Sequence, residues 1–200
     1  MNLEDLAVKL YNLGMVKIGD FILSSGIRSP FYIDLRELIG YPKILKDIAG
    51  LILTEAKKRT VFEVVVGIAT GGIPLASYIS CIANIPMAYV RKEEKKHGTG
   101  KLLEGFVVDR KVLLVDDVAT TGQSLERAVN VVRDNGGTIE NAIVVIDREQ
   151  GAKERLRRIG VNLFSLLTAK ELFEILMQKG IISRNKYEEI IEYINKTKST

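Results

Sequence analysis

The stretch VLLVDDVATTGQSL, residues 112–125, decides the fold. It begins with an apolar run, continues into the adjacent acids Asp116 and Asp117, passes through a loop of Thr and Gly, and enters a sequence with helical spacing. An apolar run without alternation is typical of a strand buried on both faces, as in a parallel sheet covered by helices. The stretch therefore predicts one strand, loop and helix of an α/β fold.

The same alternation extends to both sides of this stretch. Apolar runs predict further strands, and helical spacing predicts helices between them. The expected strands cover residues 64–68, 87–90, 112–115, 142–146 and 161–166, and the expected helices cover 72–83, 122–134 and 150–158. This order predicts a doubly wound parallel sheet from about residue 60 to 168.

The two ends of the chain have patterns of their own. Helices are expected over residues 3–13, stopped by Gly14, and from Pro42 to about Lys58, with short extended segments at 21–23 and 31–35 between them. Thr168 and Glu171 form a capping box that opens a helix closed by Gly180, and Ser183 can cap a last helix. The final NKTKST, residues 195–200, is expected to fray.

Length, cysteine usage and charge narrow the class of protein. The 200 residues suit one domain, and the single cysteine, Cys81, forms neither an intrachain disulfide nor a structural zinc site by itself, so a cytoplasmic location is expected. No run approaches the ~20 apolar residues of a membrane span. The net charge of the chain is +4, and the segment from Arg91 to Lys101 contains five cations and two acids, which gives this segment a net charge of +3. That clustering favours a local anion site over a nucleic-acid-binding surface.

The loop after the two acids predicts a site for a phosphorylated sugar. Backbone N–H groups over 119–124 and the hydroxyls of Thr120, Thr121 and Ser124 would lie at a helix N-terminus, which favours a phosphate. Asp116 and Asp117 would then bind sugar hydroxyls or help to position Mg²⁺. A plain polar turn is the alternative. GIATGG, residues 67–72, lacks the spacing of a dinucleotide-binding turn, and it is either a second anion site or a packing turn.

With these motifs in place, the chain resembles a known family. VLLVDDVATTGQSL resembles the phosphoribosyl diphosphate (PRPP) signature of type I phosphoribosyltransferases. FILSSGIRSPFYIDLREL, residues 21–38, and RKEEKKHGTG, residues 91–100, are similar to the orotate-specific branch. The resemblance implies transfer of phosphoribose from PRPP to orotate in pyrimidine synthesis, with Mg²⁺ bound mainly through PRPP. It also implies a hood over about 15–40, a PRPP-binding core over about 60–168, C-terminal helices over about 168–196, and a homodimer whose catalytic loop is shared.

The resemblance also implies roles for individual residues. A loop closing over diphosphate would carry Lys95 and His97 as catalytic residues, with hinges at Gly98 and Gly100, and Asp117 is the third expected catalytic residue. Orotate would contact Thr120 and Arg148, whose guanidinium suits a carboxylate. The PRPP-binding residues would be Arg91, Lys92, Lys95, His97, Asp116, Asp117, Val118, Ala119, Thr120, Thr121, Gly122, Gln123 and Ser124.

Some features depart from the family pattern or allow another interpretation. Some bacterial relatives have lysines at the positions of Ser24 and Gly71, so those anion contacts do not transfer. Arg148 either contacts orotate or only pairs with a neighbouring acid, and Phe31 and Tyr32 belong either to the pyrimidine site or to the core. Two rival functions remain. A phosphoribosyltransferase for a purine or another pyrimidine would not need Arg148. A PRPP-sensing regulator that binds nucleic acid would not need the basic loop.

Overall fold

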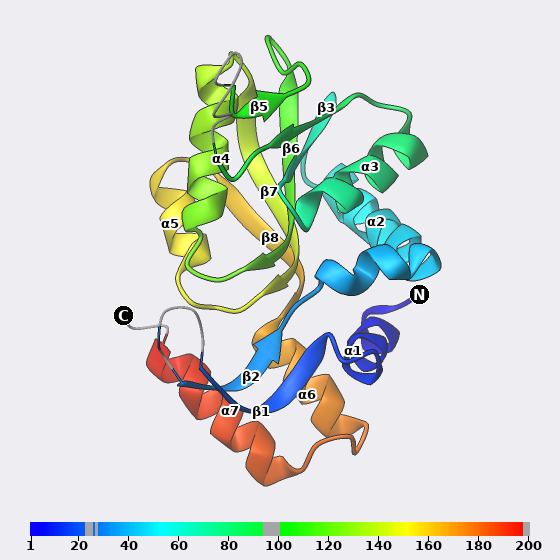
Figure 1. Cartoon of the computed structure of the whole chain (residues 1–200), viewed down its shortest axis with the longest axis vertical. Coiled ribbons are helices and arrows are strands. Elements are labelled where there is room, and N and C mark those ends of the chain that lie inside the picture. Colours follow the sequence, from blue (N-terminus) through cyan, green and yellow to red (C-terminus); the bar gives the residue numbers. More distant parts are fainter. Residues whose placement is uncertain (23–25, 27, 94–100, 198–200) are drawn as a thin grey trace.

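The computed structural model describes residues 1–22, 26, 28–93 and 101–197 (Figure 1). Its N-terminal part contains α1 (Leu3–Asn12), β1 (Val16–Ile22), β2 (Arg28–Ile33), the 3₁₀ helix η1 (Arg36–Gly40) and α2 (Pro42–Lys57). The central part contains β3 (Val64–Ile68), α3 (Gly72–Ala83), β4 (Met87–Val90), β5 (Leu103–Glu104), β6 (Lys111–Ala119), α4 (Gln123–Asp134), β7 (Thr138–Asp147), α5 (Ala152–Arg158) and β8 (Asn162–Thr168). The chain continues through α6 (Ala169–Gln178) and α7 (Arg184–Thr197).

The central sheet is doubly wound, as the sequence predicts. Its strand order is β5-β4-β3-β6-β7-β8, and every pair is parallel except the short β4–β5 pair. The chain runs outward from β3 to β4, then returns to the other side of β3 to form β6, so the direction of winding reverses between β3 and β6. In Figure 1, α2 and α3 lie on one side of the sheet and α4 and α5 on the other.

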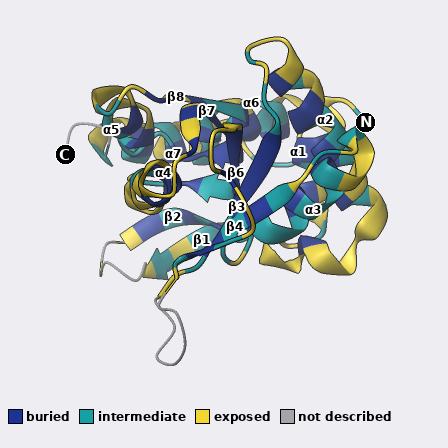
Figure 2. Cartoon of the chain, turned by 90° about the horizontal axis from the view of Figure 1, so that it is seen from above, coloured by how far each residue is buried: buried dark blue, intermediate teal, exposed yellow. Residues whose placement is uncertain are grey.

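Alternating side chains of the central strands feed two apolar cores. Val65 of β3 and Leu113 of β6 belong to the core shared with α1, α2, α3, α6 and α7, whereas Val64 and Val66 face the core shared with α4 and α5. Figure 2 shows the buried strands between partly exposed helices. Burial on both faces explains why these strands have no polar alternation in the sequence.

The strand bounds differ from the prediction where a strand is partly exposed. The segments expected at 21–23 and 31–35 form a longer antiparallel hairpin of β1 and β2. β1 begins at Val16 and includes polar, exposed positions, so its composition did not resemble a strand. β5 was not predicted because it has only two residues. At the C-terminus, α7 is helical to Thr197, so the expected fraying at 195–197 is wrong.

The bounds of the central strands differ less from the prediction than those of β1 and β2. β6 and β7 are longer than expected because their ends remain in the backbone ladder, as the pairing of Ala119 with Asp147 shows. β8 begins and ends slightly later than expected. The capping box of Thr168 and Glu171 is present: the Glu171 N–H donates to Thr168 Oγ1 at 3.2 Å, and the Thr168 N–H donates to Glu171 Oε2 at 2.7 Å.

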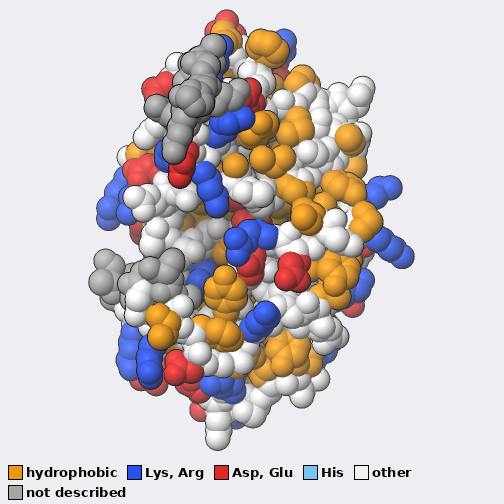
Figure 3. All heavy atoms as spheres, viewed as in Figure 1, with side chains coloured by type: hydrophobic (Ala, Val, Ile, Leu, Met, Phe, Trp, Pro, Cys, Tyr) orange, Lys and Arg blue, Asp and Glu red, His pale blue; other side chains and the backbone are white. Residues whose placement is uncertain are grey.

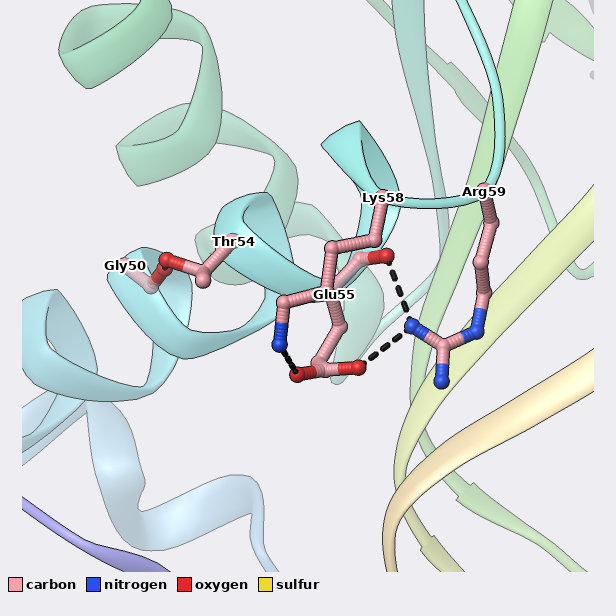
Figure 4. Close-up of polar contacts among 5 residues, drawn as sticks. All are labelled: Gly50, Thr54, Glu55, Lys58 and Arg59. Atoms are coloured by element: carbon pink, nitrogen blue, oxygen red, sulfur yellow. Dashed lines mark hydrogen bonds and ion pairs between the residues drawn. The ribbon is translucent and has the colours of Figure 1, made fainter.

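Ionic and aromatic contacts join the C-terminal end of α2 to the sheet, and Figure 4 shows the ionic contacts around Glu55. Glu55 accepts a hydrogen bond from Lys58 at 2.7 Å and also pairs with Arg59. The Arg59 guanidinium then lies 4.6 Å from the centre of the Phe164 ring on β8. Arg59 therefore connects the end of α2 to β8, whereas the ion pair of Lys58 with Glu55 stays within its own helix end.

This difference predicts unequal effects of two neighbouring substitutions. Arg59→Ala removes an ion pair and a cation–π contact, and it should lower the free energy of unfolding by about 1 kcal/mol. Lys58→Ala removes one exposed ion pair and should change it by less than about 0.5 kcal/mol. Urea unfolding of both variants measures the difference, and equal losses would show that the Phe164 contact contributes nothing.

Candidate active site

The candidate active site lies where the winding of the sheet reverses. β3 and β6 are neighbours, with Gly67 opposite Val115, so the loop after β3 meets the acids near the end of β6. Ligands of open α/β sheets bind at such a position, outside the carboxyl ends of the strands. A Cβ added to Gly71 would lie 2.2 Å from Asp117 Oδ2, so the Asp117 carboxylate would have to move. GIATGG therefore packs closely against the acids of β6.

The two acids lie within β6 and not at its end, and Asp116 is buried whereas Asp117 is half-buried. β6 continues through Asp116 and Asp117 to Ala119. The Asp117 N–H donates to Asp116 Oδ1 at 3.0 Å, and the Val118 N–H donates to Asp117 Oδ1 at 2.8 Å. Burial, reinforced by the charge of Asp117, raises the pKa of Asp116 well above its ordinary value. Burial also raises the pKa of Asp117, against the opposing hydrogen bond from Val118.

The loop after the acids forms the expected anion-sized hollow. A cavity of about 130 Å³ is lined by Asp116 and the continuous run Val118–Leu125. Gly122 has φ 79°, and a Cβ there would lie 2.8 Å from Cα of Ala152, so the turn into α4 requires glycine. The predicted residues Asp116 and Val118 to Ser124 thus line one hollow at the N-terminus of α4, a geometry that suits a phosphate, whereas Asp117 is not among its lining residues.

Arg155 fixes this loop from α5, and the sequence did not identify it. Its Nε donates to the carbonyl oxygen of Thr121 at 2.8 Å, and its Nη1 pairs with Glu126 at 2.7 Å. One guanidinium therefore holds both the loop and the first turn of α4. The only signal in the sequence was a cation in α5, which its helical periodicity does not distinguish from a solvent-exposed arginine.

The described part of the basic segment borders the same edge of the sheet. Arg91 and Lys92 follow β4 and help to line a hollow of about 340 Å³ with Gln123 and Ser124. Arg91 Nε donates to Glu104 Oε1 at 3.0 Å, so Arg91 also ties this segment to β5. Lys95, His97, Gly98, Gly100 and Ser24 lie outside the described residues. Figure 3 shows cations and acids interspersed over one face of the molecule.

Arg148 lies beside the phosphate loop in a buried aromatic environment. Its backbone N–H donates to the carbonyl oxygen of Ala119 at 2.9 Å. The residue as a whole is only 6% exposed. The guanidinium lies 4.9 Å from the centre of the Phe31 ring. Its Nε and Nη2 have no hydrogen-bond partner among the described residues, and burial lowers its pKa. The adjacent Asp147 contacts Lys153 at 3.7 Å instead.

Of the two aromatic residues of β2, the structure assigns Phe31 to the core. Phe31 is fully buried, and its ring lies 4.9 Å from that of Phe173 and 5.8 Å from that of Tyr193. Phe31 is therefore a core residue that also supports Arg148. Tyr32 is half-buried, and its ring lies 5.8 Å from that of Phe21.

Metal-ligating clusters, membrane-spanning helices and a second hollow also bear on the kind of site. In the described ranges, no three His, Cys, Asp or Glu side chains gather as a metal site. Nor does any helix in that part of the chain have the length and apolarity needed to cross a membrane. A hollow of about 440 Å³ between the β1–β2 hairpin and α7 is lined by charges of both signs and by Tyr193, and it includes none of the phosphate-loop residues.

Comparison with known proteins identifies the class that this fold and site define. A family model described as a phosphoribosyl transferase domain matches residues 37–164, which include the turn at Gly71, the acid pair and Arg148. The fold and the phosphate loop are thus those of a phosphoribosyltransferase domain.

Individual relatives narrow the class. The orotate phosphoribosyltransferase of Staphylothermus marinus is 47% identical over 98% of this chain and 96% of its own length. The crystal structure of orotate phosphoribosyltransferase from Aeropyrum pernix is 42% identical, with a TM-score of 0.76 over 89% of this chain and 99% of that one. The Mycobacterium tuberculosis enzyme in complex with PRPP is 30% identical, with a TM-score of 0.69 over 85% and 98%. The chain belongs to the family of orotate phosphoribosyltransferases.

The raised pKa of Asp116 predicts how its replacement changes stability with pH. The folded state binds the Asp116 proton more tightly than the unfolded state, so this residue lowers stability as pH rises above the ordinary aspartate range. Asp116→Asn removes that penalty and keeps an oxygen to accept from the Asp117 N–H. The variant should be more stable than the wild type at neutral pH, and the difference should disappear below the ordinary aspartate range.

Urea unfolding across this pH interval measures the effect. Asp20→Asn is the matched control, because the Asp20 side chain is 69% exposed. A stability difference for Asp116→Asn that does not depend on pH would contradict the burial of a proton-binding carboxyl at this position.

Proposed function

We propose that this chain transfers the 5-phosphoribosyl group of PRPP to a ring nitrogen of orotate, giving orotidine 5′-monophosphate (OMP) and diphosphate. The observation that carries the assignment of the base is Arg148, a buried guanidinium without a described partner for Nε and Nη2, next to the phosphate loop. A planar guanidinium binds a carboxylate through paired hydrogen bonds. Orotate has a carboxylate, whereas uracil and the purine bases do not.

The phosphate loop and the acid pair supply the PRPP half of the proposed site. The run from Val118 to Ser124 holds the 5′-phosphate, because its backbone donors gather at the N-terminus of α4. Asp116 and Asp117 lie beside that hollow and orient the ribose hydroxyls. Thr120 belongs to the same loop and provides the second contact to orotate.

The proposed mechanism needs no protein nucleophile. The orotate nitrogen attacks the anomeric carbon while the bond to diphosphate breaks, and the protein contributes by positioning the reactants and stabilising charge. Arg91 and Lys92 border the site and are assigned to diphosphate together with Lys95 and His97. The last two are assigned from the family motif alone, as catalytic residues with Asp117.

Mg²⁺ fits this proposal as an ion bound mainly through PRPP. Such ions often keep several waters and bind through one or two carboxylates and the substrate phosphates. Asp116 and Asp117 offer two carboxyl groups beside the phosphate loop, which is compatible with that mode. When bound, Mg²⁺ supplies charge neutralisation for the diphosphate.

Three aspects of the proposal come from the family resemblance and the composition. They are a homodimer that shares the catalytic loop between subunits, a cytoplasmic location, and a single domain over residues 1–200. In that domain a hood over about 15–40 covers a core over about 60–168, with C-terminal helices over about 168–196.

Turnover with alternative bases tests the proposed substrate, and Arg148 should decide it. With PRPP and Mg²⁺, the wild type should use orotate and not uracil, hypoxanthine or adenine. Arg148→Met keeps an unbranched side chain beside Phe31 but removes the charge, so use of orotate should weaken by at least roughly tenfold. Saturation curves that vary orotate and PRPP separately should show the loss only for orotate. Equal losses on both curves would make Arg148 a structural residue.

The contact between Gly71 and Asp117 predicts a second, independent loss. Gly71→Ala places a Cβ against the Asp117 carboxylate, which must then move away from the ribose. Turnover should fall by about tenfold to a hundredfold, because small displacements of positioning groups have large effects on rate. Gly50→Ala on α2 is the control, since a Cβ there meets nothing within 4 Å. Unchanged turnover in Gly71→Ala would remove Asp117 from the mechanism.

A further inference from the structure

Buried hydrogen-bond donors on two different elements lack partners close to the same aromatic ring. They are Nε and Nη2 of Arg148, after β7, and the hydroxyl of Tyr193, on α7. Among the described residues none of these atoms has a hydrogen-bond partner, although buried polar groups in folded proteins almost always have one. A buried donor without an acceptor costs free energy, so these donors require an acceptor, either water or a group that binds there.

Phe31 holds the two side chains in one neighbourhood. The Arg148 guanidinium lies over this ring, 4.9 Å from its centre. The Tyr193 ring meets Phe31 edge to face, with centroids 5.8 Å apart and an interplanar angle of 88°. Tyr193 and then Tyr32 raise the pKa of Arg148 against the stronger effect of burial.

The chemistry of the missing acceptor follows from these donors. A guanidinium and a phenol hydroxyl both donate, and a carboxylate accepts up to about four hydrogen bonds through its two oxygens. One carboxylate can therefore receive a pair of bonds from Arg148 and another from Tyr193. Asp147, the neighbouring acid in the chain, is occupied by the Glu149 N–H at 2.8 Å and by Lys153 at 3.7 Å.

We propose that the Tyr193 hydroxyl is a specificity-determining group that donates a hydrogen bond to the carboxylate of the pyrimidine held by Arg148. This inference rests on the proposed function and adds to it a residue from the C-terminal helix. α7 lies outside residues 37–164, the part that matches the phosphoribosyl transferase domain. The common domain then supplies the PRPP half of the site, and the C-terminal helix contributes to selection of the base.

Two nucleotides that differ only in this carboxylate isolate the contact. OMP has the carboxylate on its pyrimidine ring and uridine 5′-monophosphate (UMP) lacks it, while both have the same ribose and 5′-phosphate. The test is titration of each nucleotide into the full chain, for the wild type and for Tyr193→Phe, which keeps the ring against Phe31. The control is Tyr187→Phe, on the same helix, where a partly buried tyrosine packs against the core.

Tyr193→Phe should weaken OMP binding by about tenfold, as expected for loss of a hydrogen bond to a charged group, and leave UMP binding unchanged. Tyr187→Phe should change neither. Equal weakening of OMP and UMP, or no weakening of OMP, would overturn the role of Tyr193. A wild type that binds OMP no more tightly than UMP would instead overturn the proposed function, whatever Tyr193 does.

Discussion

The site depends on how closely the turn after β3 approaches the acids of β6. Asp117 lies where a side chain at position 71 would otherwise be, and Gly72 lies equally close to the backbone of β6. This contact forms because β3 and β6 are neighbours at the point where the winding reverses. The contact also helps to exclude water from the carboxyl pair, and burial is what raises the pKa of both acids. Backbone packing thus sets the electrostatics of the site.

The sequence predicts the elements that are buried on both faces better than the elements that have one solvent-exposed face. The bounds of β3, α3 and β4 match because continuous apolar runs and the turns between them leave little ambiguity. β6 was expected to end before Asp116, yet it continues because Asp116 and Ala119 still pair with β7. That pairing uses backbone groups, which side-chain patterns do not report. β1 was mostly missed for the related reason that its exposed positions are polar.

The residues of the candidate site also differ in how well the sequence predicts them. The phosphate loop was predictable because its residues are consecutive and one helix N-terminus gathers them. Arg148 was assigned from the family resemblance, and its place at the end of a predicted strand agreed with that assignment. The contacts of Arg155 and Tyr193 were not predictable, since each residue lies on a helix whose periodicity indicates only which face is apolar. Their contacts with Thr121 and Phe31 depend on tertiary packing, which a single sequence does not specify.

The buried charge of Arg148 explains how the site could select one base over another. Arg148 is buried and its pKa is lowered by burial, so its charge destabilises the free protein. A ligand carboxylate would satisfy that charge, whereas a neutral base of similar shape would bury the guanidinium without an acceptor. Sites built to pair with a polar group reject analogues that lack it more strongly than apolar pockets reject a missing methylene. In the proposed function, discrimination between orotate and uracil would follow from the cost of leaving Arg148 unpaired, and every further donor at that carboxylate would increase it.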